Sequence, residues 1–330
     1  MEQNDEELFN EFLKRNKRNI NCLLDKERNI RLKALKDFDK NLLNEENDVV
    51  LAKFWRDHLL KPLVMIYDDK IEKLRELGIN ITTQLVERFD LQDEAQAIIP
   101  GIVARMNKIP YSEPSEEVRI EFLKLLELLL DKDCLQFVPQ LSDVSVMVSK
   151  ILLDNNPEMK NKASAFCVKL WEKLPDKCGN RMKKVVISLT ENLKHQHSKV
   201  RKGSLNALKV VIGWKGAEEF LVEALPQLKM TINDRHRDVR KISIGVIDYW
   251  LRNMDINSTK KFEKDLLLFL LNGASDEIEE IQQESIQILE RHGNDMKEAL
   301  EAIGEEDESM KVDEENKDVD MDSATQGENN

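Results

Sequence analysis

The feature that most constrains the fold is a repeat of about 40 residues. Seven segments begin with a turn, an apolar residue and, in six of them, a basic residue at the start of a predicted helix. The pairs are Ile30-Arg31, Leu74-Arg75, Val118-Arg119, Met159-Lys160, Val200-Arg201, Val239-Arg240 and Ile281-Gln282, spaced by 44, 44, 41, 41, 39 and 42 residues. A period near 40 made of two helices is typical of HEAT and armadillo repeats, in which each unit buries its apolar face by stacking on its neighbours.

A column of small residues supports the same register. Four residues after each apolar position stand Ala34, Gly78, Phe122, Ala163, Ser204, Ser243 and Ser285, six of which are small. A small residue lets a neighbouring helix approach closely, as stacked repeats require. The sequence therefore predicts an all-α fold: a right-handed α-solenoid of about seven HEAT-type helix pairs, in an armadillo-like or TOG-like superhelix.

Turn residues help to set the limits of the pairs. Asn156-Pro157-Glu158 combines a capping side chain, a proline at the first helical position and an acid near the positive end of the helix, and Ser115-Glu116-Glu117 is similar. We expect one solenoid domain over residues 1–303, with units at about 6–44, 49–90, 94–131, 133–174, 176–213, 217–253 and 258–292. Four prolines predict bends in the first helices of their pairs: Pro62, Pro100, Pro139 and Pro226.

Charge is distributed unevenly along the chain. The formal net charge is −13, and residues 304–330 hold eleven acidic residues against two basic ones, so the rest is nearly balanced. That last segment has no apolar period, and we expect residues 304–330 to form a disordered acidic tail. Binding to nucleic-acid phosphates needs a basic surface, so the overall acidity argues against a nucleic-acid partner.

The termini and the cysteines indicate the compartment. No apolar stretch reaches the roughly 18 residues of a membrane span, and the first residues, MEQNDEELFNEFLKR, are too acidic for a secretory or transit peptide. We therefore expect a cytoplasmic protein with no membrane partner. The four cysteines show no Cys-x-x-Cys spacing and are expected to be buried thiols in a reducing compartment: Cys22, Cys134, Cys167 and Cys178.

No motif of a catalytic site is present. The sequence contains no GxxxxGK[ST], no GxGxxG after a strand, no HExxH and no GxSxG. His195 and His197 are the only close histidine pair, and a zinc site would need further Cys or His ligands at set spacing. We expect both histidines to be solvent-facing turn residues. The chain is predicted to be a non-enzymatic binding scaffold without cofactor or metal.

The candidate binding residues lie in two equivalent turns. Basic side chains crowd the fifth-unit turn (Lys194, His195, His197, Lys199, Arg201 and Lys202) and the sixth-unit turn (Arg235, His236, Arg237, Arg240 and Lys241). Stacking places equivalent turns on one edge of a solenoid, so the clusters are expected to form one ridge that docks an acidic partner segment. The acidic tail is an alternative occupant. The partner-binding candidates are Lys194, His197, Lys199, Lys202, Trp214, Arg235, Arg237 and Lys241.

The arginines at the helix starts are expected to be structural. Turn acids such as Asp154, Asp234 and Asp276 would pair with bases of adjoining repeats. This predicted ladder consists of Arg31, Arg75, Arg119, Arg201 and Arg240. Trp171 and Trp250 lie late in second helices at core spacing and are predicted to be buried.

Three adjacent segments resemble a known family. ENLKHQHSKVRKGSLNALKVVIGW, LKMTINDRHRDVRKISIGVIDYWL and LLNGASDEIEEIQQESIQILERHG are similar to the N-terminal array of the HEAT-repeat dynein axonemal assembly factor family, the fifth of that numbered series. In that family a His-Gln-His turn runs into a Lys-Val-Arg helix start, as in residues 195–201 here. The next Asp-Val-Arg start leads to a tryptophan, as Asp238–Arg240 leads to Trp250. The resemblance covers about residues 10–293, including RLKALKDFDKNLL and FWRDHLLKPLVMIYDD.

The resemblance implies a cytoplasmic factor for the preassembly of outer and inner dynein arms before their transport into motile cilia. The implied partners are axonemal dynein chains, among them an intermediate chain, and chaperone-linked assembly factors. Family members continue with further repeats, so activities of those repeats are not implied for this chain.

Two other kinds of scaffold share the predicted fold. A TOG-like module binds tubulin through intra-repeat turns, typically with a tryptophan in the first, whereas the first such turn here, Leu23–Glu27, has none. A transport-receptor or phosphatase-type HEAT scaffold is the other alternative.

Overall fold

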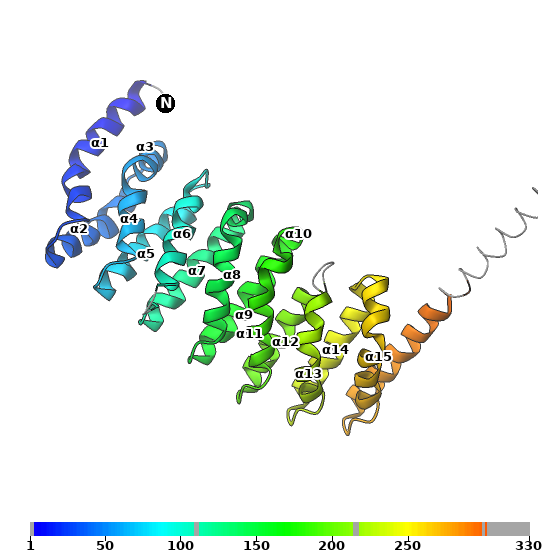
Figure 1. Ribbon diagram of the computed structural model, residues 1–330. Helices are drawn as coiled ribbons and strands as arrows, with labels where there is room; N and C mark the ends of the chain where they lie inside the picture. The colour runs from blue at the N-terminus through cyan, green and yellow to red at the C-terminus, as the bar shows by residue number, and fades with distance from the viewer. Residues whose placement is uncertain (1–2, 109–111, 214–217, 299–300, 302–330) are drawn as a thin grey trace, which may run out of the picture. The chain divides into compact units, whose positions relative to one another are not determined.

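The computed structural model describes residues 3–108, 112–213, 218–298 and 301, and these residues are the subject below (Figure 1). Helices and turns account for this part of the chain, and it contains no strand. The predicted all-α fold of HEAT-type helix pairs is therefore confirmed. The chain divides into two compact units, Met1–Met230 and a second that begins at Thr231.

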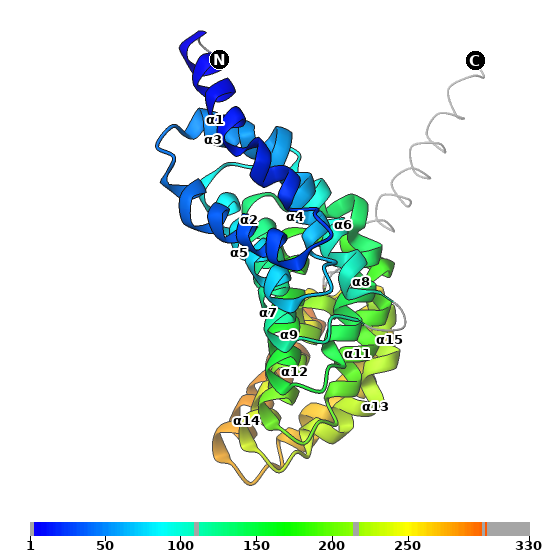
Figure 2. The ribbon, with the colours of Figure 1, turned by 90° about the vertical axis from the view of Figure 1, so that its left-hand side faces the viewer.

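The first unit is built from two layers of helices. One, here called the first-helix layer, contains α1 (Gln3–Cys22), α3 (Asp48–Phe54), α4 (Leu60–Ile66), α6 (Glu94–Met106), α8 (Leu141–Leu152) and α11 (Lys183–Asn192). The second-helix layer contains α2 (Arg28–Asn41), α5 (Glu72–Arg88), α7 (Glu116–Lys132), α9 (Pro157–Lys173) and α12 (Ser198–Ile212). Figure 2 shows α4, α6, α8 and α11 beside the row of α5, α7, α9 and α12.

Short helical segments connect these helices. They are η1 (Leu42–Asn44), η2 (Trp55–Leu59), η3 (Cys134–Gln140), α10 (Pro175–Cys178), η4 (Gly179–Met182) and η5 (Glu218–Phe220). α13 (Leu221–Ile232) starts the sixth pair, and the second unit continues with α14 (Arg237–Asn253), α15 (Ile256–Gly273) and helical residues 279–298.

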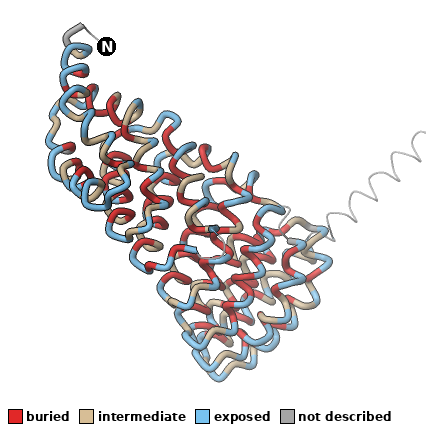
Figure 3. Tube along the Cα trace, turned by 60° about the vertical axis from the view of Figure 1, so that its left-hand side comes forward, coloured by how far each residue is buried: buried red, intermediate tan, exposed pale blue. Residues whose placement is uncertain are grey.

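The core lies between the two layers, while the turns are exposed (Figure 3). Trp171 and Trp250 have no exposed surface, so their predicted burial is confirmed. Trp55, at the start of the π-helical segment η2, is equally buried and packs against Phe89. Full burial of one large apolar side chain contributes roughly 1.5–3 kcal/mol, which is why the tertiary stack rather than local propensity stabilises these helices.

The predicted helix starts are confirmed in their capping bonds. The Asn156 side chain accepts a hydrogen bond from the N–H of Glu158 at 2.6 Å, and α9 begins at Pro157. Ser115 Oγ accepts from the N–H of Val118 at 3.3 Å at the start of α7. The four prolines lie inside helical segments, Pro62 in α4, Pro100 in α6, Pro139 in η3 and Pro226 in α13, and the bends expected at them stay a prediction.

The column of small residues marks close helix contacts. A Cβ atom added at Gly78 would lie 2.8 Å from Cγ2 of Ile66, in the first helix of the same pair. In the second unit, Ser285 faces Gly273, and a Cβ atom there would collide with the Ser285 hydroxyl. Phe122, the exception in the column, is buried edge-on against Tyr67 with ring centroids 5.3 Å apart.

Two of the four cysteines are less buried than the sequence predicts. Cys167 and Cys178 are buried, and burial raises the pKa of Cys178 to about 12. Cys22 and Cys134 are only half-buried because they stand at helix ends, so the prediction of four buried thiols is wrong for these two.

Trp214 and the tail at residues 304–330 lie outside the described residues. None of the helices described is both long and apolar enough to span a bilayer.

Candidate protein-interaction surface

Ion pairs between arginines and acids join the intra-repeat turns of neighbouring helix pairs. The rungs of this ladder are Arg31–Asp69 (2.7 Å), Arg75–Glu113 (2.5 Å), Arg119–Asp154 (2.9 Å) and, in the second unit, Arg240–Asp276 (2.7 Å). Each arginine also donates to a carbonyl of its own turn, as Arg31 does to Asp25 at 2.8 Å. Each acid accepts the backbone N–H two residues later, which fixes the turn.

Arg201, the remaining ladder candidate, donates to the carbonyls of His195 and Gln196 at 2.7 and 3.1 Å. It therefore makes the same contact with its own turn as the other ladder arginines. For Asp276, burial opposes ionisation, but the hydrogen bonds from Arg240 and from the N–H of Ile278 outweigh it and lower the pKa of this carboxyl.

The junction between the fourth and fifth pairs has a different composition. Lys160 stands where other pairs have arginine, and His195 stands where other turns have an acid. His195 Nδ1 accepts the N–H of His197 at 3.1 Å, as the carboxylates do elsewhere. Lys160 is buried and donates to the carbonyl of Leu152 and to Asn192 Oδ1, both at 3.0 Å. This junction thus satisfies its hydrogen bonds without a carboxylate in the rung.

We expect His195 to make this junction sensitive to acid. Burial, and after it the charges of Lys160, His197 and Arg201, lowers the pKa of His195. The unfolded chain therefore binds the proton more readily than the folded chain. Stability present above the ordinary histidine pKa of about 6.5 is lost as pH falls through the lowered pKa of the folded state.

We expect His195→Gln to remove this loss and His195→Asp to add about 1 kcal/mol at pH 7, because a carboxylate would face Lys160 and Arg201. The measurement is the urea midpoint of the full chain between pH 5 and pH 8, followed by circular dichroism. If the urea midpoint of His195→Gln fell toward acid pH as steeply as that of the wild type, another group would control the acid sensitivity.

The fifth pair has a large excess of basic over acidic residues. Residues 176–213 hold nine lysines and arginines but only two acids, Asp176 and Glu191. Among the described residues, no acidic side chain pairs with the exposed Lys177, Lys183, Lys184, Lys194 or Lys199. Three lysines of earlier pairs do have such partners: Lys53 with Asp57, Lys73 with Glu76 and Lys124 with Glu121.

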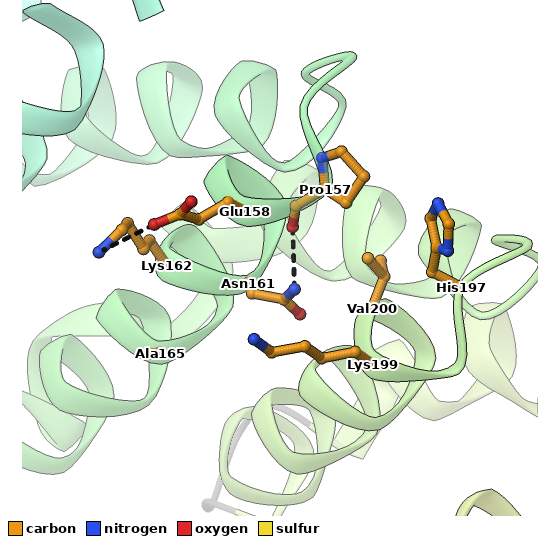
Figure 4. Close-up of a pocket in the computed structure, with 8 residues that line it drawn as sticks. All are labelled: Pro157, Glu158, Asn161, Lys162, Ala165, His197, Lys199 and Val200. Carbon is orange, nitrogen blue, oxygen red and sulfur yellow. Dashed lines mark hydrogen bonds and ion pairs between the residues drawn. The ribbon is translucent and has the colours of Figure 1, made fainter. Parts of the chain in front are cut away.

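A groove of about 720 Å³ runs between α9 and α12 (Figure 4). Its apolar wall consists of Pro157, Ala165 and Val200, and its polar lining of Glu158, Asn161, Lys162, His197 and Lys199. The two helices are close below it, since a Cβ atom at Gly203 would lie 3.0 Å from Asn161 Oδ1. In Figure 4 the Lys199 side chain extends from α12 toward Asn161.

Two charged groups in the groove differ in their partners. Lys162 lies 3.7 Å from Glu158, one helical turn away, so its charge is partly compensated. Lys199 has no such acid among the described residues, and Asn161 Nδ2 is engaged with the Pro157 carbonyl at 2.9 Å. The groove thus presents its apolar wall beside a positive rim, an arrangement suited to an acidic peptide.

The predicted binding residues are distributed as follows. In the fifth turn, His197 and Lys199 line the groove and are exposed, Lys194 is exposed at the turn, and Lys202 is half-buried on α12. In the sixth turn, Arg235 and Arg237 are exposed, Arg237 lies 3.7 Å from Asp238, and Lys241 pairs with Glu280. Whether the two turns form one ridge stays a prediction.

His197 is exposed but His195 is half-buried, so the expectation of two solvent-facing histidines is wrong for His195. Over the described part of the chain, no three His, Cys, Asp or Glu side chains gather as a metal site. Asn161, Lys183 and Lys184 were not among the binding residues predicted from the sequence. The scarcity of acids between Asp176 and Glu218 was the available signal.

Known proteins resemble this chain over most of its length. The sequence model of a family described as "Dynein axonemal assembly factor 5-like, TPR repeats" matches residues 22–307. Dynein axonemal assembly factor 5 of Xenopus laevis is 27% identical over 297 residues, which cover 90% of this chain and 35% of that protein. The Mus musculus protein of the same name is 25% identical over 72% of this chain and 28% of its own length. The chain therefore spans about a third of the length of these relatives.

Solved structures show more distant similarity. An engineered protein aligns at 15% identity with a TM-score of 0.47, covering 71% of this chain and 98% of its own. A designed armadillo repeat protein in complex with a (KR)4 peptide aligns at 16% identity with a TM-score of 0.40, covering 83% and 97%. The spacing of 39 to 44 residues between helix starts fits HEAT repeats better than TPR repeats, which have a period of about 34.

Proposed function

Because the chain belongs to the dynein axonemal assembly factor 5-like family, we propose that it is a non-enzymatic scaffold for the preassembly of outer and inner axonemal dynein arms in the cytoplasm. The names of its relatives support the assembly role. The proposed partners are axonemal dynein chains, including an intermediate chain, and chaperone-linked assembly factors. They are proposals because the relatives are about three times as long.

The proposed binding mode rests on the exposed lysines of the fifth pair. Lys194 and Lys199 are exposed without an acidic partner among the described residues, and Lys199 borders the groove between α9 and α12. A row of lysines attracts acidic segments at long range, and the groove offers apolar contact once the segment has arrived. We propose that an acidic segment of a dynein chain docks here, with Arg235 and Arg237 of the sixth turn contributing charge.

The test is a charge reversal in the full chain. Lys194→Glu with Lys199→Glu is expected to reduce capture of dynein intermediate chain from cytoplasmic extract about tenfold at low salt, and less at high salt, where exposed charges are screened. Adding Arg235→Glu and Arg237→Glu should reduce capture further. The fold should survive because exposed ion pairs contribute only about 0–1 kcal/mol each.

A matched control reverses two lysines that already have acidic partners. Lys53→Glu with Lys124→Glu changes the net charge by the same amount but lies in the second and third pairs. Equal capture by both variants, each with wild-type helix content, would contradict the proposed docking site. Capture of tubulin in place of dynein chains would favour the TOG-like alternative.

A further inference from the structure

A second groove lies in the first-helix layer of the fifth and sixth pairs. Its volume is about 210 Å³, and it is lined from α11 by Ile187, Thr190, Glu191 and Lys194 and from α13 by Glu223 and Gln227. Ile187 is 43% exposed, and two further apolar side chains of α13, Val222 and Met230, are each 55% exposed. The helix pair therefore presents an apolar strip to solvent beside charged groups.

Charges follow a fixed order along this face. Lys183 and Lys184 precede Ile187 by four and three residues, and Glu191 and Lys194 follow at intervals of four and three, so all five lie on one side of α11 and the turn that follows it. All five are exposed. The order is positive, apolar, negative and positive again, with Glu223 adding negative charge opposite the middle.

The lysines at both ends of this face have no acidic partner among the described residues. Lys184 and Lys194 are ten residues apart, which corresponds to about 15 Å along a helix. A complementary ligand needs two acidic clusters about 15 Å apart. Between them it needs apolar side chains to contact Ile187.

The chain contains a segment with this pattern. Residues 305–308 read Glu-Glu-Asp-Glu, residues 310–312 read Met-Lys-Val, and residues 313–315 read Asp-Glu-Glu. From Glu308 to Asp313 is five residues, at most about 17 Å when extended. The acidic clusters therefore match the separation of the lysines, and the intervening Met310 and Val312 match the apolar middle of the groove.

We propose that the groove between α11 and α13 binds residues 305–315 of this chain. Glu305–Glu308 and Asp313–Glu315 neutralise the lysines at the two ends of the face. Met310 and Val312, which lie on the same side of an extended segment, cover Ile187. The bound segment screens Lys183, Lys184 and Lys194 from acidic partners until it is displaced. That regulatory consequence rests on the proposed function, whereas the contact itself does not.

The test uses a fluorescent peptide of residues 304–317 and two forms of the full chain. One is the wild type. The other carries amides in place of the seven acids, namely Glu→Gln at 305, 306, 308, 314 and 315 and Asp→Asn at 307 and 313. The amide chain is expected to bind the peptide at least tenfold more tightly than the wild type, because its own segment no longer competes.

Groove variants are then made in the amide chain. Ile187→Asp is expected to weaken peptide binding about tenfold, and Lys183→Glu with Lys184→Glu at least as much. Lys199→Glu, in the second-helix layer, is the matched control and should change binding less than about twofold. Since Ile187 is partly exposed, the fold should tolerate Asp, and Ile187→Ser provides a second variant without added charge.

The peptide itself supplies the last control. Met310→Ser with Val312→Ser keeps every charge and should bind about tenfold more weakly if the apolar contact is real. Equal peptide affinity for the wild-type and amide chains would overturn the proposal. Equal weakening by Lys199→Glu and Ile187→Asp would overturn it too, because it would reveal attraction by charge alone. Neither result depends on dynein capture. A failure of this proposal can therefore be distinguished from a failure of the proposed function.

Discussion

Glu113→Gln is expected to lower the free energy of unfolding by about 3–5 kcal/mol, a large effect for one amide. Glu113 has no exposed side-chain surface and accepts from Arg75 at 2.5 Å, from Arg105 Nε at 2.7 Å and from the N–H of Ser115 at 3.0 Å. An amide of the same shape leaves Arg75, itself only 3% exposed, without a counter-charge. A buried charge that has lost its partner is far costlier than a lost surface ion pair.

The measurement is urea denaturation of the full chain, together with hydrogen exchange of the amides in α5 and α7, because a stacked array need not unfold as one unit. Glu76→Gln is the matched control. Glu76 lies on α5, as Arg75 does, but it pairs with an exposed lysine, Lys73, and its loss should cost less than about 1 kcal/mol. Equal effects of the two substitutions would show that the rung to Glu113 does not stabilise the stack.

Part of this ladder could be predicted from the sequence alone. The repeat places a base at each helix start, so Arg31, Arg75 and Arg119 could be assigned to one edge without coordinates. The acid that each base meets was harder to predict. The second rung uses Glu113, a longer side chain in a turn of different length, and only the fold brings its carboxylate 38 residues back to Arg75.

The binding surface was less predictable, because a lysine is available to a partner only if no acid of its own fold neutralises it. Lys162 meets Glu158 one turn away, which the sequence spacing suggests. Lys169 and Lys173 instead share Asp131 of the preceding repeat, a contact set by stacking. Composition alone therefore cannot separate these lysines from Lys183 and Lys184, which lack any such acid among the described residues.

The second large effect is expected at Gly273. This glycine ends α15 and faces Ser285 of the small-residue column. A Cβ atom at Gly273 would collide with the Ser285 hydroxyl and lie 2.6 Å from Cδ1 of Ile244. Ser285 cannot easily retreat, because it is fully buried and its hydroxyl donates to the Ile281 carbonyl at 2.8 Å. Three helices would have to separate to admit a side chain.

Gly273→Val is therefore expected to destabilise the second unit by about 3 kcal/mol, near the upper end for overpacked cores. Gly245→Ala is the matched control with the opposite sign. It lies inside α14 with nothing within 4 Å of an added Cβ atom. Alanine there should stabilise by about 0.5–1 kcal/mol, since glycine in a helix interior loses more backbone freedom on folding. Both are measured by urea denaturation and by hydrogen exchange in α14 and α15. If Gly273→Val proved as stable as the wild type, close helix approach would not be the reason that a small residue of the column, Ser285, stands opposite Gly273.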